Sequence, residues 1–297
     1  MNTTADFDAF VQQAWADHAD DAAGVARRIE AQGLQHLSHA DQVARLAMLA
    51  HHVWGEHLGD WPSGQSWLAQ LDAQACVDVA GRAAIRRCQA SQALCADGTA
   101  APFDLSPSDR IRVRAMAAAN LATADTQRAR SLFDRALQDC EEAALPDSDA
   151  AVRALAVSAN NLAGTLEEKT PRSSRERELM IAAAQAARHC WERAGGWTEV
   201  ERAEYRLALT WLEAGETALA LKHGQLCLQI CLDNDAPAFE RFFAWEALTR
   251  VQRAAGDASA HAQALIEADG AFAALDEADQ QACQLSLDQL HAPPAGN

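Results

Sequence analysis

Hydrophobic residues recur every three or four positions along most of this chain, which is the spacing of an amphipathic helix. The pattern begins with Phe7, Phe10, Val11 and Ala14 and continues as far as Leu290. Only 6% of the residues are aromatic and 49% are hydrophobic, a composition that fits closely packed helices better than sheets. The sequence therefore predicts an all-α fold with roughly 10–13 helices.

One stretch of this pattern occurs twice. Residues 115–123 (AMAAANLAT) are echoed by residues 156–164 (AVSANNLAG), and a second helical pattern follows each copy, at 128–142 and at 175–194. Recurring helix pairs stack in solenoid proteins, because each pair buries its apolar face against the next one. The sequence therefore predicts an α-solenoid of antiparallel helix pairs.

Charge narrows the range of partners. Lys and Arg total 25 against 42 Asp and Glu, which gives a formal net charge of −17 at pH 7. Proteins that bind nucleic acid use clustered Lys and Arg to neutralise phosphates. We therefore expect no nucleic-acid partner, and we interpret the acidity first as a solvated surface.

The cysteines and the termini bear on location. The chain has eight Cys and no CxxC spacing, and most of them lie among apolar helical neighbours, as expected of small core residues in a reducing compartment. Residues 1–8 lack the basic and apolar regions of a secretory signal, and no apolar run approaches the ~20 residues of a membrane span. We expect a cytoplasmic protein without membrane contact.

Three stretches share a turn glycine that is followed by small and apolar positions at helical spacing. They are Gly59, Trp61, Gly64, Leu68 and Leu71; Gly215, Thr217, Ala220 and Cys227; and Gly256, Ala258, Leu265 and Ala268. Glycine permits the backbone conformation of a tight turn between helices, and small residues let the helices touch. In these features the chain resembles the tetratricopeptide repeat family, with degenerate copies, and the resemblance implies a right-handed superhelix.

The spacing of these patterns predicts the domain organisation. We expect N-terminal helical repeats over residues 1–96, a loop and hinge over 97–108, and tetratricopeptide-like repeats over 109–290. The last helix, residues 277–290, is expected to cover the apolar end of the array, and residues 291–297 are expected to be disordered.

The family resemblance also implies a binding groove, lined by the first helix of each pair. It places Asn120 and Asn161 where the family's groove Asn holds the backbone of a ligand, since an amide both donates and accepts hydrogen bonds. The same register brings seven further side chains to that side: Arg202, Tyr205, Arg206, Phe243, Glu246, Arg250 and Arg253.

These residues lead to the principal functional hypothesis, a non-catalytic scaffold without cofactor that binds a protein segment or peptide. Guanidinium groups pair with carboxylates, so the ligand is expected to carry an acidic stretch or a free C-terminus. Two plainer interpretations stay open: Asn120 and Asn161 could bond to adjoining helices, and the Arg residues could form exposed ion pairs with neighbouring Glu.

Two alternative functions remain. In one, a regulatory sensor closes on a small peptide or metabolite about the hinge at 97–108. In the other, a metal-dependent enzyme uses the imidazoles between His51 and His57. His52 and Glu56 lie four residues apart and share a helix face, but the HExxH spacing is absent, so they are weak metal candidates. His36 and His39 are the further ligands considered.

Overall fold

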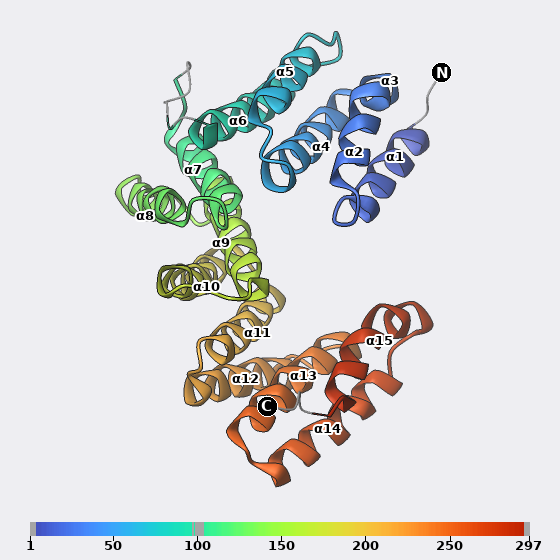
Figure 1. The fold of residues 1–297 in the computed structure, drawn as a ribbon, viewed down its shortest axis with the longest axis vertical. Coiled ribbons are helices and arrows are strands. Elements are labelled where there is room, and N and C mark those ends of the chain that lie inside the picture. The colour runs from blue at the N-terminus through green and yellow to red at the C-terminus, as the bar shows by residue number, and fades with distance from the viewer. Residues whose placement is uncertain (1–3, 97, 99–103, 294–297) are drawn as a thin grey trace. The chain divides into compact units, whose positions relative to one another are not determined.

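The computed structural model describes residues 4–96, 98 and 104–293, and the chain divides into two compact units, Met1–Leu145 and Pro146–Asn297 (Figure 1). Throughout the described residues the regular structure is helical and contains no strand, which confirms the all-α prediction. Residues 97 and 99–103 of the predicted hinge, and 294–297 of the predicted tail, lie outside the described residues.

The N-terminal unit contains eight α-helices and two π-helical segments among its described residues. They are α1 (Thr4–Asp17), α2 (Ala22–Arg28), η1 (Ile29–Gly33), α3 (Leu34–His36), α4 (Ala40–His51), η2 (His52–His57), α5 (Trp61–Asp72), α6 (Val79–Ala96), α7 (Pro107–Leu121) and α8 (Thr126–Glu142). Together with the C-terminal unit, the described chain has more helices than the 10–13 expected. One reason is that the helical stretch over residues 22–36 is divided into α2, η1 and the short α3.

The core of the N-terminal unit forms where α1, α2, α4, α5 and α6 meet. Its largest fully buried side chains include Phe7, Leu46, Leu49 and Leu68, and Trp67 packs beside them. Burying each such side chain contributes roughly 1.5–3 kcal/mol, so the apolar faces recognised in the sequence are what hold these helices together.

A close helix contact explains a small residue in η2. A Cβ on Gly55 would lie 2.8 Å from Nδ2 of Asn120 on α7 and 3.0 Å from the Trp61 ring. Gly55 therefore lets α7 approach η2 and lets the Asn120 amide enter the interior of this unit.

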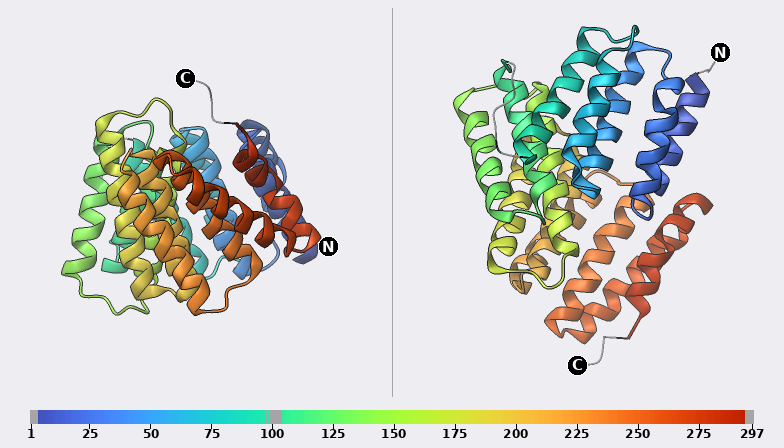
Figure 2. Two further views of the ribbon diagram at one scale, coloured as in Figure 1. Left: turned by 90° about the horizontal axis from the view of Figure 1, so that it is seen from below. Right: turned by 45° about the horizontal axis from the view of Figure 1, so that its top comes forward.

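The C-terminal unit is built from seven α-helices in its described part. They are α9 (Ala150–Glu168), α10 (Ser174–Ala194), α11 (Trp197–Glu213), α12 (Thr217–Asp233), α13 (Ala238–Ala255), α14 (Ala258–Ala273) and α15 (Glu277–His291). Each odd-numbered helix from α9 to α13 packs against the next helix in the chain, and α9, α11, α13 and α15 also contact one another in succession (Figure 2). The first helices of the pairs thus form one continuous row, from which a binding surface can be built.

The turn glycines identified in the sequence have the backbone conformation that was predicted. Gly59, Gly215 and Gly256 have φ values of +61°, +80° and +74°. At Gly256, which ends α13, the N–H bonds to the carbonyls of Arg253 and Gln252. A left-handed residue after the last helical turn satisfies carbonyls that the helix leaves free, and glycine adopts this conformation without a steric penalty.

No helix of the described chain is long and apolar enough to cross a membrane.

Candidate functional site

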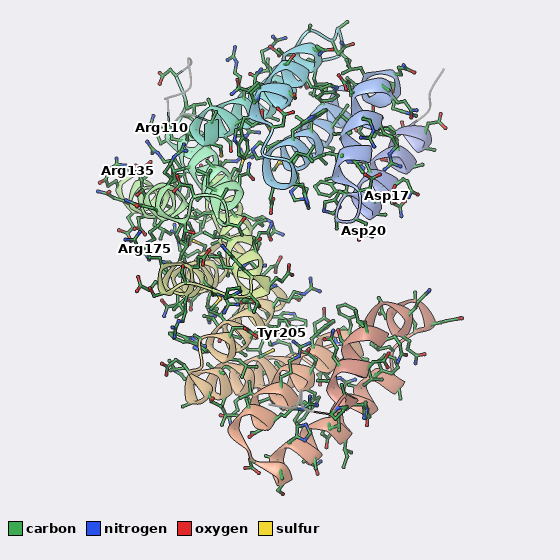
Figure 3. The ribbon with its side chains drawn as sticks, in the orientation of Figure 1. Asp17, Asp20, Arg110, Arg135, Arg175 and Tyr205 are labelled. Carbon is green, nitrogen blue, oxygen red and sulfur yellow. The ribbon has the colours of Figure 1, made fainter. Side chains whose placement is uncertain are left out.

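A hollow of about 330 Å³ opens on the row of first helices in the C-terminal unit. We call it the α11–α13 pocket, and it is lined by Asn160 of α9, by Glu201, Arg202, Tyr205 and Arg206 of α11, and by Phe239, Glu240 and Phe243 of α13. Tyr205 projects from the middle of α11 (Figure 3). The pocket brings together four of the residues predicted from the sequence, namely Arg202, Tyr205, Arg206 and Phe243.

Aromatic rings form the apolar wall of this pocket. The Phe243 ring meets that of Tyr205 edge-on at a centroid distance of 5.7 Å and that of Phe239 at 5.0 Å. Edge-to-face contacts of this kind favour fixed ring positions. The wall is therefore a pre-arranged surface for an apolar side chain.

Both guanidinium groups of the pocket already have a carboxylate partner. Arg202 Nη2 donates to Glu240 Oε1 at 2.8 Å, although its side chain remains 61% exposed. Arg206 bonds to Glu167 on α9, and Gly164 leaves room for the guanidinium, since a Cβ there would lie 3.3 Å from Nη1. As the alternative interpretation proposed, both Arg residues pair with Glu, but the glutamate side chains are only 10% and 8% exposed, so these are not exposed ion pairs.

Buried carboxylates lie behind the pocket wall. The Cys227 thiol donates to Glu201 Oε1 at 2.9 Å, and burial raises the pKa of Glu201. Burial also raises the pKa of Glu246, although Arg250 Nη2 lies 2.5 Å from its Oε1. Burial and the nearby Glu246 carboxylate raise the pKa of Tyr205 as well. The two buried carboxylates support the wall from inside, whereas the Tyr205 ring is part of the wall itself.

The remaining predicted residues of α13 point elsewhere. Arg250 pairs with Glu246 and donates to Gln289 Oε1 on α15 at 3.2 Å. Arg253 bonds to the carbonyl of Leu290 and to His261 Nε2, and it lines a different hollow between α13, α14 and α15. These two guanidinium groups hold α15 against the rest of the unit.

The two echoed asparagines have different environments. Asn120 is buried in the N-terminal unit, and its Nδ2 donates to His51 Nε2 at 3.2 Å. Because that nitrogen then carries no proton, Ser91 Oγ donates to it as well, at 2.9 Å. Asn161 of α9 is exposed and does not line the α11–α13 pocket, whereas its neighbour Asn160 does. The amide that faces the pocket is therefore that of Asn160, one position before the predicted Asn161.

His52 and Glu56, the weak metal candidates predicted from the sequence, contact each other in the structure. His52 Nδ1 lies 2.7 Å from Glu56 Oε2, and His57 Nε2 lies 3.1 Å from His52 Nε2. His51 points inward to Ser91 and Asn120, and His36 stacks on Phe10. The residue that sequence reasoning missed is His18, which joins His52 and His57.

Four pocket residues were also missed: Asn160, Glu201, Phe239 and Glu240. The spacing of two of them could have indicated this. Glu201 lies one helical turn before Tyr205, and Phe239 lies one helical turn before Phe243.

No family model matches the chain, and no curated protein matches it.

Proposed function

We propose that the C-terminal unit binds a peptide or an extended segment of another protein in the α11–α13 pocket and performs no catalysis. One observation carries the proposal: a hollow of about 330 Å³ combines an aromatic wall with an exposed guanidinium group on three successive first helices. Concave, largely apolar sites with a few polar groups are typical of ligand recognition.

The ligand class follows from the chemistry of the lining. Tyr205, Phe239 and Phe243 offer a surface for an apolar side chain, and Arg202 has donors beyond the one that Glu240 accepts. The Arg202 side chain is 61% exposed, so a ligand carboxylate can bind its outward donors while Glu240 keeps its own bond. We therefore propose a ligand with an apolar side chain next to a carboxylate, supplied by an acidic residue or a free C-terminus.

The packing of the helices and the turn glycines support a broader proposal. Helix pairs whose first members contact one another in a row are the arrangement of tetratricopeptide-like solenoids, and we propose a right-handed solenoid of this type. Seven of the eight cysteines are buried as small core residues, which suits a reducing environment, and we propose a cytoplasmic location.

A selected peptide tests the pocket. Peptides with random sequences and free C-termini are displayed, selected on the full chain, and measured by fluorescence anisotropy against wild type and variants. We expect Arg202→Glu to weaken binding at least tenfold, because it places a carboxylate where the ligand's own must bind. Blocking the ligand carboxylate as an amide should have a similar effect.

Arg241→Glu is the matched control, because this substitution makes the same charge change. Arg241 is exposed on α13 and does not line the pocket. Equal losses for the two variants would show only a net-charge effect. Failure to select any peptide that Arg202→Glu weakens would refute the proposed site.

A further inference from the structure

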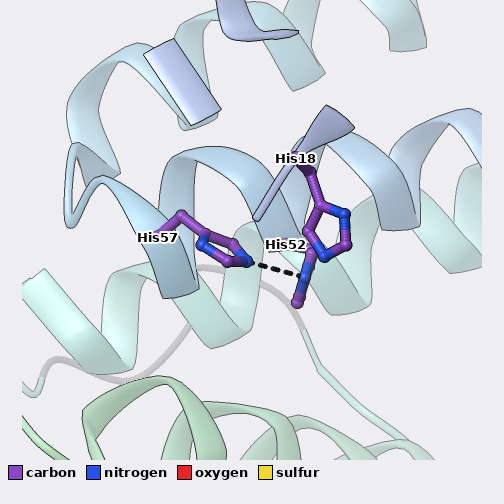
Figure 4. A group of neighbouring side chains, drawn as sticks. All are labelled: His18, His52 and His57. Atoms are coloured by element: carbon purple, nitrogen blue, oxygen red, sulfur yellow. Dashed lines mark hydrogen bonds between the residues drawn. The ribbon is translucent and has the colours of Figure 1, made fainter. Parts of the chain in front are cut away.

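Three imidazoles from two separate stretches of the N-terminal unit converge. His18 follows the end of α1, and His52 and His57 are the first and last residues of η2. One ligand nitrogen from each lies within 4.8 Å of the other two (Figure 4). The ring centroids are 4.9 Å apart for His18 with His52, 4.9 Å for His18 with His57, and 4.7 Å for His52 with His57.

The π-helical geometry of η2 makes this convergence possible. Residues five apart in an α-helix point about 140° away from each other. In a π-helix the hydrogen bond joins residues five apart, so the side chains of such residues lie on nearly the same side. His52 and His57 are therefore neighbours only because the helix widens here. Single-turn π segments inside α-helices are frequent at functional sites.

Hydrogen bonds fix which nitrogen each of two rings presents. His18 Nδ1 lies 2.6 Å from the carbonyl oxygen of Trp15, so Nδ1–H must donate and Nε2 keeps a lone pair. His52 Nδ1–H donates to Glu56 Oε2 at 2.7 Å, which again leaves Nε2 with a lone pair.

This arrangement matches the partners of metal-bound imidazoles. A histidine that binds a metal almost always donates its other ring N–H to a carboxylate or a backbone carbonyl, which fixes the ring and increases its basicity. His52 has the carboxylate partner and His18 has the carbonyl partner.

The separation of the His52 and His57 nitrogens is also suitable. Zn–N bonds of about 2.0–2.1 Å in a tetrahedral site place ligand nitrogens about 3.3 Å apart. His52 Nε2 and His57 Nε2 are separated by 3.1 Å. Since His52 Nε2 has no proton, His57 Nε2–H donates to it, and metal binding through His57 Nε2 requires that this proton move to Nδ1 of the same ring.

We propose that His18, His52 and His57 form a binding site for a divalent transition metal ion, and specifically for Zn²⁺, with an open fourth position. Imidazole is a preferred ligand of zinc, and three protein ligands with one open position form a known type of zinc site. Trp15, whose ring lies 5.0 Å from that of His52, covers one side of the cluster. This proposal does not depend on the peptide pocket of the C-terminal unit.

Zinc titration of the untagged full chain, in competition with a chromophoric chelator, tests the proposal. We expect one Zn²⁺ per chain, and at least tenfold weaker binding for His57→Gln, chosen first because His57 is exposed and its replacement leaves the core intact. His18→Ala should have a similar effect. Glu56→Ala should weaken binding by about ten- to a hundredfold, as loss of a partner of a metal-bound imidazole does.

His189→Ala is the matched control, because it removes an exposed imidazole from α10 in the other unit. Its zinc affinity should equal that of the wild type, and circular dichroism should show all variants equally helical. Co²⁺ in place of Zn²⁺ should give the intense visible absorption of a tetrahedral site. Equal zinc binding by wild type and His57→Gln, or the weak absorption of octahedral Co²⁺, would overturn the proposal.

Discussion

Both units are built from helices with small residues at their contacts, but the polar side chains inside the two units differ. In the described part of the N-terminal unit the helices are interrupted by η1 and η2, and the buried titratable groups include the imidazole of His51. In the described part of the C-terminal unit all helices are α-helical, and the buried titratable groups include the carboxylates of Glu201 and Glu246. Similar apolar patterns therefore support different polar interiors.

This difference teaches where sequence periodicity stops being informative. A regular α-helix lets one face be deduced from residue spacing, so the pocket residues Arg202, Tyr205 and Arg206 could be assigned to one side. A π segment changes the angle between residues, so the contact of His52 with His57 could not be deduced in this way.

The largest expected consequence is an opposite response of the two units to acid. Burial lowers the pKa of His51 to about 4, from 6.5 in the unfolded chain. Between these values the unfolded state binds the proton and the folded state does not. The free energy of unfolding of the N-terminal unit therefore decreases as the pH is lowered from 6.5 to 4. The loss is roughly 3 kcal/mol when pH reaches 4.

In the C-terminal unit, burial raises the pKa values of Glu167, Glu201 and Glu246, so the folded state binds protons first. Their contribution to stability therefore increases as pH falls from neutral towards 5. Hydrogen exchange at pH 7 and pH 5, corrected for intrinsic rates, should show α4 and α7 less protected at pH 5 and α11 and α13 equally or better protected. His51→Gln should remove the response of the N-terminal unit alone; parallel losses in both units would contradict the comparison.

The echoed asparagines provide the next test. Asn120→Ala removes the buried donor to His51 and leaves a cavity, and we expect a loss of about 2 kcal/mol in the free energy of unfolding. Asn161→Ala changes an exposed side chain and should stay within about 0.5 kcal/mol of the wild type. Urea denaturation monitored by circular dichroism measures both.

Similar costs for the two asparagine variants would mean that Asn120 is not the internal donor that the structure shows. The pair is informative because both residues occupy the same place in the sequence echo, so local helix propensity cancels between them.

The fold was largely predictable because local rules determine it. Apolar spacing located the helices at 128–142, 175–194 and 277–290, which are α8, α10 and α15, and the conformations of Gly215 and Gly256 follow from turn chemistry alone. The divided helix after α1 was not predictable, since a π segment such as η1 has no apolar period of its own.

The site was predictable only in part. Side chains on one helix face, such as Tyr205 and Arg206, could be grouped by spacing. What each guanidinium contacts depends on the neighbouring helix: Arg253 reaches Leu290 of α15, 37 residues away in the chain. His18 was missed for the same reason, because only tertiary packing brings it to η2.

Replacing two glycines of the C-terminal unit by alanine should change the stability in opposite directions. Gly256 has a φ of +74°, so Gly256→Ala forces a left-handed alanine and should cost about 1 kcal/mol. Gly270 lies inside α14, and a Cβ there would meet no atom within 4 Å, so Gly270→Ala should stabilise by roughly 0.5–1 kcal/mol. Thermal unfolding of the two variants gives the sign directly, and a stabilising Gly256→Ala would contradict the turn assignment.

The smallest effect on stability is expected at the residue with the largest expected effect on binding. Arg202 pairs with Glu240 at 2.8 Å; the Arg202 side chain is 61% exposed and that of Glu240 10%, so water screens this pair more than the Arg250–Glu246 pair, where Glu246 is 0% exposed. Arg202→Gln should therefore change the free energy of unfolding by less than about 0.5 kcal/mol, while it weakens the selected peptide. Arg250→Gln, which removes the partner of fully buried Glu246, should be clearly more destabilising. If the two variants were equally destabilised, Arg202 would be part of the scaffold, and the α11–α13 pocket would lose the group proposed to recognise a carboxylate.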